Sequence, residues 1–423
     1  MQQEKTVAYG NTIQKPINRK SLFLLLASIG PGLTVMLADT DAGSIVTAAQ
    51  SGAQWGYKLL ALQLFLIPIL YFVQELTIRI GITTRKGHGQ LIREVFGVKW
   101  AWFSVGTLLL AAIGALITEF SGIVGVGMLF GVSKWVTVPL VATILILISG
   151  VGKYKRVERI AIFVGLFELV FIPAALYAKP DFGAIMNAFV GEQPLTNNSY
   201  WLLIAANVGA VIMPWMVFYQ QGAVIDKGLS KNILKYSRID TFFGSVVTQI
   251  IMAAVLILTA ATIGKLNPET PLNNIQQIAN ALTPFLGNFV GKILFAVGLT
   301  GAALIAAIVV SLATSWAFSE VLNVPCSLNS KWKQAPVFYS FYCGGIIVAA
   351  IAVLVGIPLV SLTVAVEVMN SLLLPIVLGF LLALGWKALP KKYQLKKWEK
   401  VTLIIIYVLV CSLGIFTVFQ MFF

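Results

Sequence analysis

The hydrophobic positions of the chain come in long runs that are almost free of charge and are separated by short polar connections. A helix needs about 20 mainly apolar residues to cross a ~30 Å hydrocarbon core, and several runs approach or reach that length. Ten runs are evident, and a further span, the fifth along the chain, lies around Glu168, so the sequence predicts about eleven membrane-spanning helices. The ten runs are Phe23–Leu37, Leu59–Val73, Phe103–Ile117, Val138–Ile148, Leu202–Met213, Val246–Ile263, Ile293–Leu312, Cys343–Leu362, Leu372–Leu384 and Val401–Phe423.

The composition supports an all-α membrane protein. Hydrophobic residues make up 58% of the 423 residues and charged residues only 11%, whereas a soluble domain carries about 25% charged residues. The runs also lack the period-two alternation of apolar and polar residues that marks a membrane β-barrel. We therefore expect helices that are surrounded by lipid.

The positive charge is distributed in a way that predicts the orientation of the helices. The formal net charge is +14, and 25 of the 30 Lys and Arg residues fall in alternate connections, beginning with the N-terminal segment. Basic connections stay in the cytoplasm. We therefore expect a cytoplasmic N-terminus, an odd number of spans and a C-terminus outside, and we attribute the basic charge to topology and not to nucleic-acid binding.

The chain divides into a cytoplasmic segment, residues 1–20, and a single transmembrane domain, residues 21–423. We expect no cleavable signal peptide, because the first apolar run has no convincing small-residue cleavage site. Three isolated cysteines and one histidine predict neither a disulfide framework nor a multi-histidine metal site. We interpret His88 as a solvated residue of a basic connection.

Two apolar segments are interrupted at corresponding places. The first contains Gly30-Pro31-Gly32 and then Asp39 to Ser44, and the sixth contains Asn207 to Ala210 and then Met213-Pro214. Glycine and proline favour unwinding, which is tolerated at membrane depth where the backbone lines a cavity or is buried in protein. This layout suggests two inverted five-helix repeats, residues 21–180 and 200–386, with an extra helix at 400–422. In such transporters the substrate site lies between the two broken helices.

Asp39 and Asp41 lie inside an apolar segment, where a charge is costly and indicates function. On an unwound stretch the two acids can converge on a cation, with Ser44 and free carbonyl oxygens near Thr40 and Ala210 completing an oxygen shell. Alternatively, one of the two aspartates caps the second half-helix. Met213 offers a thioether ligand at the other interruption, or it simply packs in the core.

Other polar side chains lie in the apolar runs. Glu119 and Glu367 are candidate proton carriers, metal ligands or structural partners, and Asn370 lies one helical turn from Glu367. Gln220 either lines the pathway or bridges helices. We expect Glu168 and Glu320 to lie near the ends of their spans in structural roles.

Taken together, these segments resemble the Nramp family of divalent metal-ion transporters over roughly residues 25–385. The family's DPGN helix, its GAxxMP motif and its YRxLE turn have counterparts here in the same order and at matching spacings. The matching residues are Asp41-Ala42-Gly43-Ser44, Gly56-Tyr57-Lys58-Leu59-Leu60, Gln74-Glu75-Leu76, Arg79-Ile80-Gly81, Thr83, Tyr154, Glu158, Gly209-Ala210-Val211-Ile212-Met213-Pro214 and Leu374-Pro375.

The resemblance implies a LeuT-like inverted repeat of eleven or twelve helices and inward movement of Mn²⁺ or Fe²⁺, usually with protons. It also implies that Asp41 is the acidic ligand, Met213 the soft ligand and the carbonyl oxygen of Ala210 a further ligand. Ser44 stands where the family has a ligand asparagine.

Several positions depart from the family pattern. Asp39 is an added acid, Trp215 and Gln220 replace two histidines, and Glu367 stands at a glutamine position. Leu116 aligns with a missing acidic partner of Glu119, and the arginines of the ninth helix have no counterpart. These losses put proton coupling in doubt. The harder ligands resemble the Nramp-related magnesium branch and favour Mg²⁺ slightly, while Met213 favours Mn²⁺.

The sequence thus predicts a transporter of divalent cations, Mg²⁺ or Mn²⁺/Fe²⁺, that works by alternating access. The alternative is a LeuT-like transporter of an amino acid or another small organic solute, although two aspartates at the break would repel a carboxylate. We expect no enzymatic activity, no resident cofactor and no nucleic-acid partner. A bacterial inner membrane is the expected location.

Overall fold

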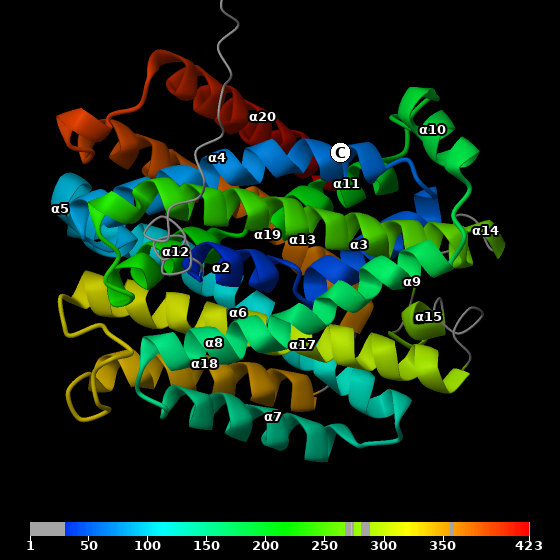
Figure 1. The fold of residues 1–423 in the computed structure, drawn as a ribbon, viewed down its shortest axis with the longest axis horizontal. Helices are drawn as coiled ribbons and strands as arrows, with labels where there is room; N and C mark the ends of the chain where they lie inside the picture. Colours follow the sequence, from blue (N-terminus) through cyan, green and yellow to red (C-terminus); the bar gives the residue numbers. More distant parts are fainter. Residues whose placement is uncertain (1–29, 267–271, 273–274, 281–287, 356–358, 423) are drawn as a thin grey trace, which may run out of the picture.

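The computed structural model describes residues 30–266, 272, 275–280, 288–355 and 359–422. Every element in these ranges is a helix, and most of the helices run along one common direction (Figure 1). The expected cytoplasmic segment 1–20 lies outside the described residues.

The first half of the chain contains two helices that follow each other with hardly a gap, then a series of longer ones. In order these are α2 (Pro31–Asp39), α3 (Ala42–Trp55), α4 (Leu60–Thr84), α5 (His88–Phe96), α6 (Val98–Leu129), α7 (Lys134–Ser149), α8 (Tyr154–Gly165), the 3₁₀ turn η1 (Leu166–Val170), α9 (Phe171–Tyr177) and α10 (Phe182–Val190).

The second half begins with another closely spaced pair of helices. Its elements are α11 (Asn198–Val211), α12 (Pro214–Asp226), η2 (Lys231–Ile233), α13 (Leu234–Ala261), α14 (Ile263–Leu266), α15 (Ile275–Asn280), α17 (Asn288–Leu322), α18 (Pro336–Val355), α19 (Leu359–Lys387), η3 (Lys391–Tyr393) and α20 (Lys397–Phe422).

Nine helical stretches in the described residues are long and apolar enough to span a bilayer, and one of them joins α11 to α12. The shorter apolar helix α7 and the broken pair α2–α3 fall on the two remaining hydrophobic runs, which accounts for the predicted total of about eleven. The predicted all-α membrane fold is therefore confirmed.

The connections gather at the two ends of the bundle (Figure 1). Helix α5, the η3 turn and the link between α17 and α18 lie at one end, and α10, α14 and α15 lie at the other. The connections at the first end are those in which lysine and arginine accumulate. This arrangement agrees with the charge alternation, and the assignment of that end to the cytoplasm stays a prediction.

Both expected helix interruptions are present. Helix α2 ends at Asp39, and α3 starts after Asp41, whose side chain caps it. Helix α11 ends at Val211, and α12 starts at Pro214. Proline favours the first position of a helix, because it has no N–H to leave unpaired there. The long helices α6, α13 and α17 and helix α19 pack around these two broken pairs.

The fifth span is also irregular, and one prediction about it is wrong. The helical path from Tyr154 to Tyr177 passes through the η1 turn in its middle, and this turn carries Glu168. The sequence predicts Glu168 near the end of its span, but the residue is fully buried near the middle. Glu320, in contrast, lies close to the end of α17, where its carboxylate accepts hydrogen bonds from the backbone N–H groups of Gly89 and Gln90.

The prediction that His88 is solvated is also wrong. His88 is fully buried at the start of α5, where its ring contacts Phe218 edge-on with 4.7 Å between the ring centroids. Its Nδ1 lies 3.3 Å from Oε1 of Gln221 on α12. The amphipathic character of α5, whose Leu91 and Ile92 are also buried, explains why this connection folds against the bundle.

Burial lowers the pKa of His88 to about 4, below the ~6.5 expected for an unfolded chain. The folded state therefore binds fewer protons than the unfolded state between these values, and its stability falls as the pH drops below about 6.5. We predict that acidification from pH 7 to pH 5 lowers the free energy of unfolding of the wild type by about 2 kcal/mol more than that of a His88→Gln variant. Thermal unfolding of both proteins across this pH range measures the difference, and parallel pH profiles would contradict the prediction.

Candidate metal site

The two helix breaks meet directly. The Ser44 hydroxyl, in the first turn of α3, donates a hydrogen bond of 2.9 Å to the carbonyl oxygen of Ala210 at the end of α11. Ala210 and Val211 are the last residues of their helix, so carbonyl groups there lack partners within the helix. Two of the predicted ligands, from positions 166 residues apart, are thus brought together.

Asp41 caps the second half-helix, which is one of the two predicted alternatives, and one of its oxygens is left for the other, which is cation binding. Its Oδ1 accepts a 2.7 Å hydrogen bond from the backbone N–H of Ser44, so Asp41 caps α3. Its Oδ2 is buried and has no hydrogen-bond partner in the described part of the chain. One carboxylate oxygen therefore fixes the side chain and the other is available to a cation, because capping and metal binding use different oxygens.

Met213 lies at the second break, three residues beyond Ala210. Its side chain is fully buried, and its sulfur accepts a 3.1 Å hydrogen bond from the indole N–H of Trp215. The backbone N–H of Met213 points to the sulfur of Met216. Trp215, which stands in place of a histidine, therefore positions the thioether and supplies no metal ligand of its own.

A second layer of acids surrounds the N-terminus of α3. Glu119 on α6 accepts a 3.1 Å hydrogen bond from the backbone N–H of Ala42, so it too occupies the positive end of this half-helix. Glu367 on α19 reaches Gly43 so closely that a Cβ atom there would collide with its Oε1. Asn370 donates a 3.0 Å hydrogen bond to Oε2 of Glu367, which places both residues on one face of α19, as predicted.

Gln220 and Asp39 point to other neighbours. Gln220 donates a 3.1 Å hydrogen bond to Thr241 on α13, and no hydrogen bond in the described residues joins it to the predicted ligands. Asp39 ends α2 and interacts electrostatically with Asp41, Glu367 and Glu168. Both of its oxygens are buried without a hydrogen-bond partner among the described residues.

Sequence reasoning missed a polar network on the other side of the break in α11. Asn207 donates to the Ser51 hydroxyl of α3 at 2.8 Å and accepts from Gln63 of α4 at 2.6 Å. This network holds the two broken helices and α4 together next to the Ser44–Ala210 contact. An asparagine inside an apolar run was a usable signal, because a buried amide must find partners.

The predicted site residues are closed off from solvent. Asp39, Asp41, Ser44, Ala210, Met213, Glu119 and Glu367 are each at most 1% exposed. Within the described residues, no group of three or more His, Cys, Asp or Glu side chains is arranged to hold a metal ion. The Ser44 hydroxyl and the Ala210 carbonyl group are in contact where the two breaks meet, Asp41 caps the same helix start as Ser44, and Met213 lies at the second break.

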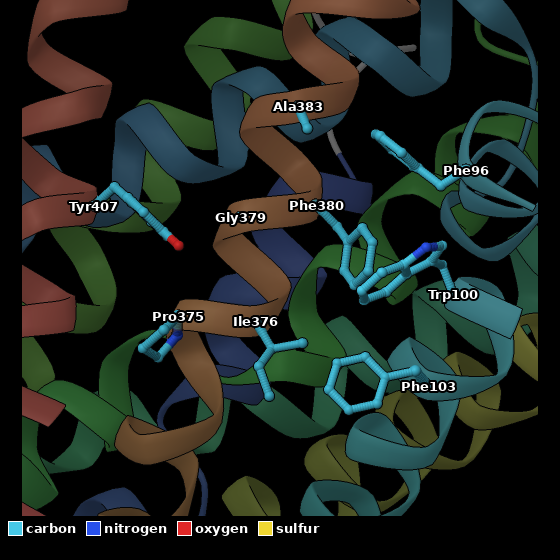
Figure 2. Close-up of a pocket in the computed structure, with 9 residues that line it drawn as sticks. All are labelled: Phe96, Trp100, Phe103, Pro375, Ile376, Gly379, Phe380, Ala383 and Tyr407. Atoms are coloured by element: carbon cyan, nitrogen blue, oxygen red, sulfur yellow. The ribbon is translucent and has the colours of Figure 1, made fainter. Parts of the chain in front are cut away.

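An apolar groove lies elsewhere on the bundle (Figure 2). It has a volume of about 420 Å³ and is formed by α6, α19 and α20, with Trp100, Phe103 and Phe380 along its wall. Tyr407 faces it from α20, with its hydroxyl near Gly379. Nearly all of its surface is hydrocarbon, so it offers no chemistry for a cation.

Two comparisons with known sequences point to one family. The profile of the Nramp family, described as natural resistance-associated macrophage protein-like, matches residues 32–420. A curated relative, the divalent metal cation transporter MntH of Brucella suis biovar 1 (strain 1330), is 25% identical over 288 residues. That alignment covers 65% of this chain and 62% of the relative, so the chain spans less than two thirds of the relative's length.

Solved structures share the fold. The manganese transporter of Eremococcus coleocola, crystallised with an aromatic bis-isothiourea substituted compound, matches with a TM-score of 0.74 at 19% identity over 96% of this chain and 89% of that one. MhsT, crystallised in complex with L-phenylalanine, matches with a TM-score of 0.57 at 14% identity over 96% of this chain and 99% of that one. The fold is LeuT-like. Because the family profile covers nearly the whole chain, this protein belongs to the Nramp family.

Proposed function

We propose that the protein carries a divalent metal ion across the membrane, with Mn²⁺ as its preferred cargo. The observation that carries this proposal is the meeting of the two helix breaks. Asp41, whose Oδ2 has no hydrogen-bond partner in the described residues, and Ser44 both lie at the start of α3, and the Ser44 hydroxyl donates a hydrogen bond to the Ala210 carbonyl oxygen. Asp41, Ser44, the Ala210 carbonyl oxygen and Met213 would surround the ion, and Asp39 would attract it.

The charge around the site favours a cation over an amino acid. Asp39, Glu119 and Glu367 each interact electrostatically with other carboxyl groups. An amino-acid substrate would bring its own carboxylate into this negative environment. MhsT shows that the fold accommodates L-phenylalanine, but in this chain the capping position at the half-helix N-terminus is already filled by Asp41.

The thioether distinguishes Mn²⁺ from Mg²⁺. Soft sulfur ligands favour transition metals, whereas Mg²⁺ prefers oxygen ligands and keeps several of its waters. Met213 is fully buried at the break and positioned by Trp215. Mg²⁺ is the second candidate, because Glu119 and Glu367 add oxygen ligands near Asp41 and because both histidines of the family pattern are missing.

Transport through a closed site requires one half-helix to move, and we propose alternating access. Helix α2 is held at its start by Asp240 of α13, which accepts a 2.9 Å hydrogen bond from the N–H of Gly32. Glu158 and Lys227 form a 2.8 Å ion pair that joins α8 to the end of α12, and this ion pair lies next to Gly30. Release of these contacts would open the path from the site toward that end of the bundle.

We predict that Asp41→Ala abolishes uptake of Mn²⁺ into proteoliposomes while leaving the protein folded, because the cation loses its charged ligand at the start of α3. The assay compares Mn²⁺ and Mg²⁺ side by side and records the internal pH. Normal uptake by this variant would contradict the site assignment. Acidification of the lumen during uptake would show that an acid such as Glu119 carries protons in place of the missing histidines.

We predict that Met213→Leu, which keeps the volume of the side chain and removes the sulfur, lowers the preference for Mn²⁺ over Mg²⁺ by about tenfold or more. Competition of Mg²⁺ against Mn²⁺ uptake measures this preference. Met216→Leu is the matched control, since Met216 is equally buried in the first turn of the helix that Met213 precedes, and its sulfur accepts a hydrogen bond from the backbone of Met213. An unchanged preference in Met213→Leu would mean that the thioether packs in the core and does not bind the ion.

We predict that Gly43→Ala weakens Mn²⁺ binding, because the new methyl group meets Oε1 of Glu367 and the carboxylate of Asp41. Isothermal titration of the purified protein measures the loss of affinity. Gly106→Ala on α6 is the control, because a Cβ atom there has no neighbour within 4 Å, and it should bind Mn²⁺ normally. Equal affinities for the two variants would show that the ion is not held at the N-terminus of α3.

A further inference from the structure

Two buried carboxylates near the first break, those of Asp39 and Glu168, do not belong to the proposed ligands of the divalent ion. Asp39 is proposed only to attract that ion, and Glu168 has no role there. Asp39 ends α2, and Glu168 lies in the η1 turn of the fifth span. They interact electrostatically with each other, and both are at most 1% exposed. No hydrogen bond of regular geometry reaches any of their four carboxylate oxygens in the described part of the chain, although the Thr248 hydroxyl lies close to Asp39 and the Thr40 hydroxyl close to Glu168. An unpaired buried carboxylate is costly, so two adjacent ones require an explanation.

Two hydroxyl groups lie between the carboxylates. Thr40 of the break and Thr248 of α13 have their Oγ1 atoms 2.8 Å apart. Thr248 faces Asp39, and Thr40 faces Glu168. The four side chains come from three membrane-crossing units and form a continuous group of oxygen atoms. Gly165, at the start of the η1 turn, lies against Leu37 of α2, which fixes the distance between these units.

The backbone around this group also presents oxygen. Helix α2 ends at Asp39, so its last carbonyl groups and the negative end of its dipole point toward the same place. The 3₁₀ turn interrupts the regular hydrogen bonding of the fifth span, and such turns within helices often mark functional positions. Half-helix C-termini and unwound carbonyl groups bind Na⁺ in transporters with broken helices.

A cation would be attracted to this group of acids. Glu168 interacts with Asp41 and Thr40. A divalent ion held by Asp41 and Met213 brings two positive charges into an environment of five buried acids, namely Asp39, Asp41, Glu119, Glu168 and Glu367. A second cation next to Asp39 and Glu168 would compensate part of the remaining negative charge.

We propose that Asp39, Glu168 and the hydroxyl groups of Thr40 and Thr248 form a second cation site, and that its ligand is Na⁺. A monovalent hard cation fits the donors, which are hydroxyl and carbonyl oxygens with two carboxylates and no sulfur. The proposal concerns binding, and it does not depend on which divalent ion is transported.

The test is binding of ²²Na⁺ to the purified full-length protein, together with thermal unfolding in NaCl and in choline chloride at equal ionic strength. The wild type should bind one Na⁺ saturably and should unfold at a higher temperature in NaCl, because a ligand that binds only the folded state stabilises it. Glu168→Gln, which keeps the shape of the side chain, should lower the Na⁺ affinity at least about tenfold. Thr248→Val should lower it by a smaller factor.

Two controls separate this site from general effects. Glu320→Gln changes a buried acid at the end of α17 whose partners are Gly89 and Gln90, and it should bind Na⁺ as the wild type does. Mn²⁺ binding is measured separately in choline chloride, where no Na⁺ is present. Comparison of Asp41→Asn with the wild type under this condition tests the first site alone. Failure of Mn²⁺ binding in the wild type would overturn the proposed function and leave the Na⁺ result intact.

Three results would overturn the proposal. The first is a wild type that neither binds ²²Na⁺ nor responds to NaCl. The second is a Na⁺ response that survives in Glu168→Gln, since the ion would then bind elsewhere. The third is Glu168-dependent binding of two Mn²⁺ or Mg²⁺ ions per chain, with no competition from Na⁺, which would make the second site divalent.

Discussion

The structure depends on the cost of placing acids in a hydrocarbon layer. Asp39, Asp41, Glu119, Glu168 and Glu367 are all buried within membrane-crossing elements, and each charge at such a depth costs at least about 2.5–3.5 kcal/mol. In the part of the chain that the structure describes, the ion pairs, such as Glu75 with Arg79 and Glu158 with Lys227, involve none of these five acids. The acids therefore rely on helix N-termini, amide and hydroxyl groups and, in our account, on cations.

The two interrupted helices make this arrangement possible. A continuous helix would satisfy its own backbone and leave no carbonyl group for a ligand. The break between α2 and α3 also places two neighbouring aspartates close to each other and to further acids. Asp41 caps α3, and Asp39 interacts electrostatically with Asp41, Glu367 and Glu168.

Much of the architecture could be predicted from the chain, because its signals are local. Hydrophobic length predicts the eleven spans, and Pro214 and the capping Asp41 predict where the broken helices restart. The contact between Ser44 and Ala210 follows from the layout of the two breaks, although no local pattern gives its distance. The positions of His88 and Glu168 could not be predicted. His88 is buried because α5 packs against α12, which is a tertiary contact, and Glu168 lies in a 3₁₀ turn in the middle of its span.

The central claim is that one divalent ion binds where the two breaks meet. Anomalous diffraction from crystals grown with Mn²⁺ tests it most directly, because the signal gives the position of the ion without reference to activity. Our account predicts one strong peak within coordination distance of the Asp41 carboxylate, the Ala210 carbonyl oxygen and the Met213 sulfur. A peak that contacts Glu119 and Glu367 but none of these three groups, or no peak at saturating Mn²⁺, would contradict it.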